Sequence, residues 1–202
     1  PNINNAKGVA TLNMLKKLAS LSNPDYLTHD SEAIKVEWES GKVALMTLWA
    51  SRSGTLLDDE GDAKITAATK LTGPATVGGG NIPAATLWWD GFTLAKNRSD
   101  SDAEATFIAL AHAASNKKMV ADAADQAVWL VEGFVPGPKS IGVIEAVKMG
   151  AKPYPMLPQM GLMHGALGSE IVEFLQGKES AEQALKDVEA AYISKAKEQG
   201  FL

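Results

Sequence analysis

A helix that ends on a glycine and leads into a short apolar run is the feature that most constrains the fold of this chain. Ile34 and Trp38 lie one helical turn apart, and Gly41 can adopt the left-handed conformation that stops a helix. The residues that follow, Val43–Leu48, form an apolar run of strand length. The pattern therefore predicts a helix, a sharp stop and a buried strand that ends at Trp49.

The composition excludes several classes of function. With 202 residues, of which 46% are hydrophobic, the chain is long enough to bury a core in one large domain or two small ones. A net charge of -5, from 19 basic and 24 acidic residues, argues against a nucleic-acid partner, because phosphate binding needs concentrated Lys and Arg. The chain has no cysteine and three scattered histidines, so we expect neither a metal site nor a cofactor.

The sequence also bears on processing and on membrane insertion. No apolar run approaches the roughly 20 residues that a membrane span needs. The chain begins at Pro1, without a starting methionine or a signal peptide. We therefore expect a processed or dissected piece of a longer protein.

Helical and strand signals alternate along the chain, which favours an α/β architecture. Besides the run at 43–48, strands are predicted at 64–71 and within the aromatic segment 87–94. The three glycines at 78–80 lack the Lys-Ser/Thr of a phosphate-binding loop, so this stretch is interpreted as a linker or crossing. Helices are predicted near the N-terminus, at 31–40, from 101, at 116–126, at 141–149, from 160 to a stop at Gly177, and at the C-terminus.

Two of these helices are expected to begin with capping boxes, Ser101 with Glu104 and Ser180 with Gln183. In each helix, apolar residues recur at helical spacing, which predicts a face buried in the core. The first face consists of Phe107, Ile108, Ala111 and Ala114, and the second of Ala184, Leu185, Val188, Ala191 and Tyr192.

Residues 38–49 resemble a signature of the extracellular solute-binding proteins that serve bacterial ABC importers of sugars, the maltose-binding-protein family. The signature is an aromatic residue, two further residues, glycine, lysine, a small residue and methionine. Other motifs occur in the family's order: the glycine-rich crossing, the turn at 134–136, a helix start at 158–160 and the terminal pattern at 177–187. The chain is therefore similar to the C-terminal half of such a protein.

This resemblance implies an α/β, two-lobed fold like that of the type II periplasmic binding proteins. The implied map assigns residues 1–73 and 139–202 to the C-terminal lobe and residues 80–131 to a segment of the N-terminal lobe. Residues 74–79 and 132–138 would form the hinge crossings between the lobes.

The function implied by the resemblance is import, with no chemistry on the ligand. A small carbohydrate would bind in the cleft between the lobes, close the hinge and be handed to the membrane permease of an ABC importer. The implied location is periplasmic, or extracellular and membrane-anchored in a Gram-positive cell. The missing N-terminal half of the same protein is then a further partner, and without it we expect weak sugar binding or none.

Sugar recognition needs an aromatic ring for the C–H face of a pyranose and planar polar groups for its hydroxyls. Trp49, Arg52, Trp88, Trp89 and Asp90 supply that chemistry near predicted strand ends and crossings. Strand alternation would send the rings of Trp88 and Trp89 to opposite faces, so one of the two is expected to meet the ligand. Asp90 would share the face of Trp88. By contrast, the tryptophan that opens the signature is expected to anchor its helix in the core.

Two further candidates leave a structural and a ligand-binding role equally open. Trp129 precedes the second crossing and would either line the cleft or pack in its lobe. His164 stands where the family's helix carries a sugar-stacking aromatic, so it would either contact ligand or fill space. This replacement argues against a long malto-oligosaccharide as the ligand.

Other classes of protein remain as alternatives. A carbohydrate-active enzyme fragment would use paired carboxylates, with Asp90 and Glu132 as the candidates. A purely structural α/β interaction domain would explain the amphipathic helices without a ligand. Within the same fold, a polyamine or an amino acid is an alternative ligand, whereas the scarcity of His and Tyr argues against iron.

Overall fold

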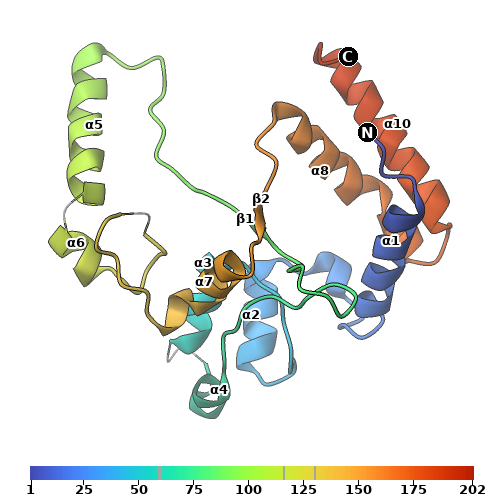
Figure 1. The fold of residues 1–202 in the computed structure, drawn as a ribbon, viewed down its shortest axis with the longest axis horizontal. Coiled ribbons are helices and arrows are strands. Elements are labelled where there is room, and N and C mark those ends of the chain that lie inside the picture. The colour runs from blue at the N-terminus through green and yellow to red at the C-terminus, as the bar shows by residue number, and fades with distance from the viewer. Residues whose placement is uncertain (59–60, 116, 130) are drawn as a thin grey trace. The chain divides into compact units, whose positions relative to one another are not determined.

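The computed structural model describes residues 1–58, 61–115, 117–129 and 131–202 (Figure 1). Helices account for 54% of the chain. The α-helices are α1 (Ala6–Ala19), α2 (Ser31–Glu39), α3 (Ala50–Ser53), α4 (Ala63–Ala68), α5 (Asp100–Ser115), α6 (Lys117–Asp122), α7 (Ile141–Lys148), α8 (Pro158–Glu170), α9 (Val172–Leu175) and α10 (Ala181–Glu198). Short 3₁₀ helices lie at Tyr26–Thr28, Gly54–Leu57 and Pro138–Ser140, and the two strands are β1 (Thr86–Leu87) and β2 (Lys152–Pro153).

The expected α/β, two-lobed fold is wrong, because the chain is mostly helical. Within the described residues, the sheet consists of β1 and β2, which run parallel with Thr86 opposite Lys152 and Leu87 opposite Pro153. Apart from this pair, Thr76 and Pro83 form an isolated antiparallel bridge around the glycine turn. A two-residue ladder cannot form the central sheet that an α/β fold needs.

The three predicted strands fail for different reasons. Val43–Leu48 pairs with no strand among the described residues, and Leu45 is 91% exposed, so the run is neither a strand nor buried. The stretch predicted at 64–71 instead forms α4, whose first turn is capped where the carboxylate of Asp62 accepts a hydrogen bond from the Lys64 N–H at 2.8 Å. In the aromatic segment 87–94, the strand ends after its first residue.

Contacts divide the chain into two units, each with its own buried residues. Unit 1 comprises Pro1–His29 and Pro155–Leu202, and unit 2 comprises Asp30–Tyr154. The lobe boundaries that the resemblance implies, at 74–79 and 132–138, remain predictions.

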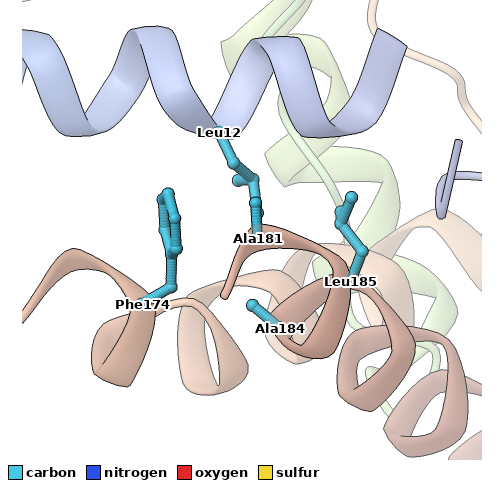
Figure 2. Close-up of a cluster of buried hydrophobic side chains, with 5 residues drawn as sticks. All are labelled: Leu12, Phe174, Ala181, Ala184 and Leu185. Carbon is cyan, nitrogen blue, oxygen red and sulfur yellow. The ribbon is translucent and has the colours of Figure 1, made fainter. Parts of the chain in front are cut away.

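The core of unit 1 lies where α1, α9 and α10 meet. Figure 2 shows Leu12 of α1 pointing toward Ala181 and Leu185 of α10, with Phe174 of α9 beside them. A second cluster joins Met163 and Ala166 of α8 to Val188 of α10. The face predicted for the last helix is thus confirmed at Ala184, Leu185 and Val188, whereas Ala191 and Tyr192 are half-buried.

Local signals at helix ends act as predicted in several places. The Ser180 hydroxyl accepts the Gln183 N–H at 3.2 Å, which caps α10. Gly41 and Gly177 both have left-handed backbones, with φ of 72° and 79°. The backbone N–H of the residue after each glycine donates to the carbonyl five residues earlier. The Lys42 N–H donates to the Glu37 carbonyl, and the Lys178 N–H to the Glu173 carbonyl. Both helices therefore end in the glycine-based motif that satisfies the last free carbonyls.

The helix predicted from residue 101 differs from expectation in its cap and in its burial. The side chain that caps α5 is Ser99, whose hydroxyl accepts the Asp102 N–H at 3.2 Å, rather than Ser101. No residue of α5 is buried, and Phe107 and Ile108 are 62% and 59% exposed. The core-packing role predicted for this helix is therefore wrong within this chain.

The remaining helix predictions differ in detail. The helix expected from 160 to the stop at Gly177 is divided at Ile171 into α8 and α9. The one expected at 116–126 is observed as α6, with residue 116 outside the described residues. In the part of the chain that the structure describes, no helix is both long and apolar enough to cross a membrane.

Unit 2 is held by a few specific contacts. The indole N–H of Trp38 donates to the Thr69 hydroxyl at 2.9 Å, which ties α2 to the end of α4 and supports the anchoring role predicted for this tryptophan. The ammonium of Lys139 lies 2.6 Å from the carboxylate of Asp58. This hydrogen bond raises the pKa of Lys139, because it stabilises the charged form.

Candidate functional site

The ends of the two paired strands bring Trp88 and Tyr154 together. Leu87 is opposite Pro153 in the parallel ladder, and the Tyr154 N–H donates to the Leu87 carbonyl at 2.8 Å. The residues that directly follow the two strands, Trp88 and Tyr154, are both aromatic. The pairing of the strands therefore brings their side chains together. The rings stack with centroids 3.9 Å apart and planes 23° from parallel. Two residues 66 positions apart in sequence thus form one aromatic surface.

The indole of Trp88 is held in place on two sides but remains accessible. Tyr154 covers one face of the ring, and the indole N–H donates to the Thr86 hydroxyl at 3.0 Å. Even so, Trp88 is 51% exposed. A ring that is fixed and exposed is suited to stacking on an apolar ligand face, because little conformational freedom remains to be lost on binding.

Trp89 and Asp90 follow directly and are also open to solvent. Trp89 is 48% exposed, and Asp90 is exposed as well. The segment has left the ladder at this point, so strand alternation no longer dictates which way the two side chains point. The structure nevertheless places a second indole and a carboxylate next in sequence to the stacked pair.

Trp49 and Arg52 lie at the start of α3, where the chain turns into a short helix. The Trp49 carbonyl accepts the N–H groups of Arg52 and Ser53, and its own ring is 63% exposed. The guanidinium of Arg52 is ion-paired with Glu32. The hollow beside this pair has a volume of about 70 Å³, which leaves room for about two water molecules. Arg52 therefore serves in an ion pair here, while Trp49 presents its ring to solvent.

Trp129 and His164 belong to different units. The indole N–H of Trp129 donates to the Ala123 carbonyl at 2.9 Å, and Trp129 is half-buried within unit 2. His164 is exposed on α8 and belongs to unit 1. The other six predicted ligand-binding residues all belong to unit 2.

Tyr154 and Thr86 are site residues that the sequence analysis missed. Tyr154 directly follows strand β2, in a stretch that contains three prolines between residues 152 and 158. No local signal in either segment indicates that this strand pairs with the one before Trp88. The pairing is a long-range contact, so it could not be derived from spacing alone.

Catalytic and metal chemistry find little in the described part of the chain. The two carboxylates considered for an enzyme, those of Asp90 and Glu132, are both exposed to solvent. Among the described residues, no cluster of three or more His, Cys, Asp or Glu is arranged to hold a metal ion.

No family model matches the chain, and no curated protein matches it either. The resemblance to sugar-importer binding proteins therefore remains a prediction that rests on the motifs of the sequence.

Proposed function

We propose that this chain binds a small carbohydrate and that the open face of Trp88 is the surface on which the sugar ring stacks. The observation that carries the proposal is the fixed, half-exposed indole of Trp88, backed by Tyr154 at 3.9 Å. The C–H groups on one face of a pyranose are apolar, and a rigid aromatic ring is their usual partner. A tryptophan that only fills a core would be buried, whereas Trp88 is held by Tyr154 and is still half-exposed.

Polar groups for the sugar hydroxyls follow Trp88 directly in the sequence. The carboxylate of Asp90 accepts hydrogen bonds, and the indole of Trp89, the residue after Trp88, supplies a donor. Trp49 adds another exposed ring within unit 2. These groups bind and orient a sugar without a nucleophile or a general acid.

The proposed role is the import of the sugar rather than its conversion. It rests on the resemblance of residues 38–49 to importer binding proteins. The partners under this proposal are a membrane permease of an ABC importer and an N-terminal half that completes the site. The location is periplasmic, or extracellular with a membrane anchor. With an incomplete site, we expect the chain alone to bind sugar weakly.

Weak binding is best measured at single residues, by following the five indole N–H signals in nuclear magnetic resonance spectra during titration with mono- and disaccharides. We expect the Trp88 signal to shift and to saturate. Trp88→Ala should weaken binding roughly tenfold, because the stacking surface is removed. Tyr154→Phe should retain it, because the stacked ring remains.

Phe92→Ala is the matched control, since Phe92 is an exposed aromatic in the same segment but has no stacking partner in the described structure. Its loss should leave sugar binding unchanged. A Trp88 signal that stays in place at every sugar concentration would contradict the proposal. Hydrolysis of a chromogenic glycoside would favour an enzyme, and a response to polyamines or amino acids alone would change the ligand class.

A further inference from the structure

The segment between β1 and α5 is exposed to solvent and contains a pair of residues that can react with each other. In Figure 1 it runs as irregular chain from β1 to α5. Every residue from 89 to 99 is exposed. Within this segment Gly91 follows Asp90, and at no other position in the sequence does a glycine follow an aspartate or an asparagine. The reactivity of this pair depends on how freely its backbone moves.

The structure leaves the backbone around this pair without restraint. In the described part of the chain, no residue from 89 to 94 donates or accepts a hydrogen bond, and the Asp90 carboxylate takes part in no ion pair. A Cβ atom built on Gly91 would meet no other atom within 4 Å. A stretch with neither hydrogen bonds nor buried contacts samples many backbone conformations, and glycine widens that range.

This freedom allows the side chain of Asp90 to close a ring onto the next peptide nitrogen. The Gly91 nitrogen attacks the side-chain carboxyl carbon of Asp90, and the new C–N bond completes a five-membered succinimide. The amide proton and the hydroxyl of the protonated carboxyl group leave together as one water molecule. The step is intramolecular, so its rate depends on how often the two atoms meet, and glycine has no side chain to obstruct them.

Water then reopens the ring at one of its two carbonyl groups. Hydrolysis at the side-chain carbonyl restores aspartate. Hydrolysis at the main-chain carbonyl leaves the peptide bond on the side-chain carbon, and the product is isoaspartate. The water released in the first step is taken up in the second, so the conversion needs no other reactant.

We infer that Asp90–Gly91 is a modification site at which the folded chain forms isoaspartate spontaneously. The conversion inserts a methylene group into the main chain and moves the carboxylate onto a shorter branch. Asp90 lies two residues after Trp88, so the modification displaces a carboxylate in the segment that carries the stacked ring. The chemistry does not depend on whether that ring binds a sugar.

Asp30 provides a contrast within unit 2. It also precedes a small residue, Ser31, but its carboxylate accepts the N–H groups of Glu32 at 3.1 Å and of Ala33 at 2.9 Å. These hydrogen bonds cap α2 and occupy the side chain. We therefore expect Asp30 to remain aspartate for as long as the chain stays folded.

Prolonged incubation of the full chain at neutral pH and physiological temperature, with and without guanidinium chloride, tests the inference. Proteolytic peptides are then separated by chromatography, and isoaspartate is measured by enzymatic methylation of its carboxylate. At Asp90, the folded chain should react within a factor of about two of the unfolded rate. At Asp30, folding should slow the reaction at least tenfold. Absence of isoaspartate at Asp90, or slowing of tenfold or more there on folding, overturns the inference.

Two substitutions test the chemistry in the folded chain. Gly91→Ala adds a Cβ that obstructs the attack, but it fits the structure, since the surrounding space is open and the φ of Gly91 lies outside the left-handed region. This variant should form isoaspartate at least tenfold more slowly. Asp90→Asn should form it at least tenfold faster, because a side-chain amide releases ammonia to the same attack more readily than a carboxylate releases water. Equal rates in all three chains overturn the inference.

Discussion

At the scale of single residues, two tryptophans of one segment have different environments. Trp38 is half-buried, and its indole N–H is satisfied by the hydroxyl of Thr69, which is only 7% exposed. Trp49 lies eleven positions further on and is 63% exposed. One ring therefore holds two helices together, whereas the other is available to a ligand.

Replacing these two tryptophans should separate stability from binding. Trp38→Ala is expected to lower the free energy of unfolding by about 2 kcal/mol, because it removes packing and the indole hydrogen bond to the Thr69 hydroxyl, which then keeps only its bond to the Ile65 carbonyl. Trp49→Ala should change it by no more than about 0.5 kcal/mol. Urea unfolding measures both values, and sugar titration of the Trp49 variant tests its predicted ligand role. Equal losses of stability in the two variants would contradict this division.

A single carboxylate holds the N-terminal arm of unit 1. The Glu189 carboxylate accepts the N–H groups of Ile3 at 2.7 Å and of Asn4 at 3.1 Å. The hydrogen bond from Asn4, followed by that from Ile3, lowers the pKa of Glu189 below its ordinary value of 4.5. A lowered pKa in the folded state means that the contact stabilises above pH 4.5 and is lost as the pH falls through the folded value.

The arm should therefore loosen at acid pH. We expect the protection of the Ile3 and Asn4 amides against hydrogen exchange to fall as the pH drops below 4.5. Glu189→Gln should reduce that protection at neutral pH and make it independent of acidification. An equally strong acid response in the glutamine variant would show that another group controls the arm.

At the scale of elements, a helix end depends on the conformation of one residue. Gly177 closes α9 with φ of 79°, a region that costs about 1 kcal/mol for a residue with a Cβ atom. Gly161 is also in unit 1, but it lies inside α8, and a Cβ added there would meet open space. Replacing glycine by alanine should therefore have opposite effects on stability at Gly177 and Gly161.

Glycine-to-alanine variants test this contrast within one unit. Gly177→Ala is expected to destabilise unit 1 by about 1 kcal/mol through backbone strain. Gly161→Ala should stabilise it by roughly 0.5 to 1 kcal/mol, because alanine is the better helix former. The measurement is chemical denaturation followed by far-ultraviolet circular dichroism. A stabilised Gly177 variant would mean that the left-handed helix end is absent in solution.

At the scale of the whole molecule, the buried side chains fall into separate sets in the two units. Leu185 is 2% exposed in the unit 1 cluster with Leu12 and Phe174. All five tryptophans, by contrast, belong to unit 2. Tryptophan fluorescence therefore reports on unit 2, whereas circular dichroism reports on the helices of both units.

Leu185→Ala should reveal whether the units unfold independently. The variant is expected to destabilise unit 1 by about 3 kcal/mol, since it leaves a cavity between α1 and α10. The fluorescence-detected transition of unit 2 and its sugar titration should remain unchanged. Equal shifts of the fluorescence and circular-dichroism transitions would instead indicate a single cooperative unit.

Features with a complete local signal were predictable from the sequence. The stops at Gly41 and Gly177 and the Ser180 cap each depend on residues within a few positions of one another. The same holds for the exposed aromatic residues, which were identified as candidates by their chemistry. Their partners were not identified, because nothing near Trp88 in sequence points to Tyr154.

Tertiary structure decided the features that need a distant partner. Within the part of the chain that the structure describes, Val43–Leu48 has the composition of a strand but pairs with no neighbour, and α5 has the pattern of a core helix but no buried residue. Conversely, β1 and β2 pair despite their short length, and this pairing stacks the ring of Trp88 against that of Tyr154. The sequence by itself determined the glycine stops of α2 and α9 and the Ser180 cap of α10, because caps and glycine stops act through nearby backbone groups. Which strands pair, which faces are buried and which ring backs Trp88 depend on contacts between residues far apart in the chain, and only the folded structure supplies them.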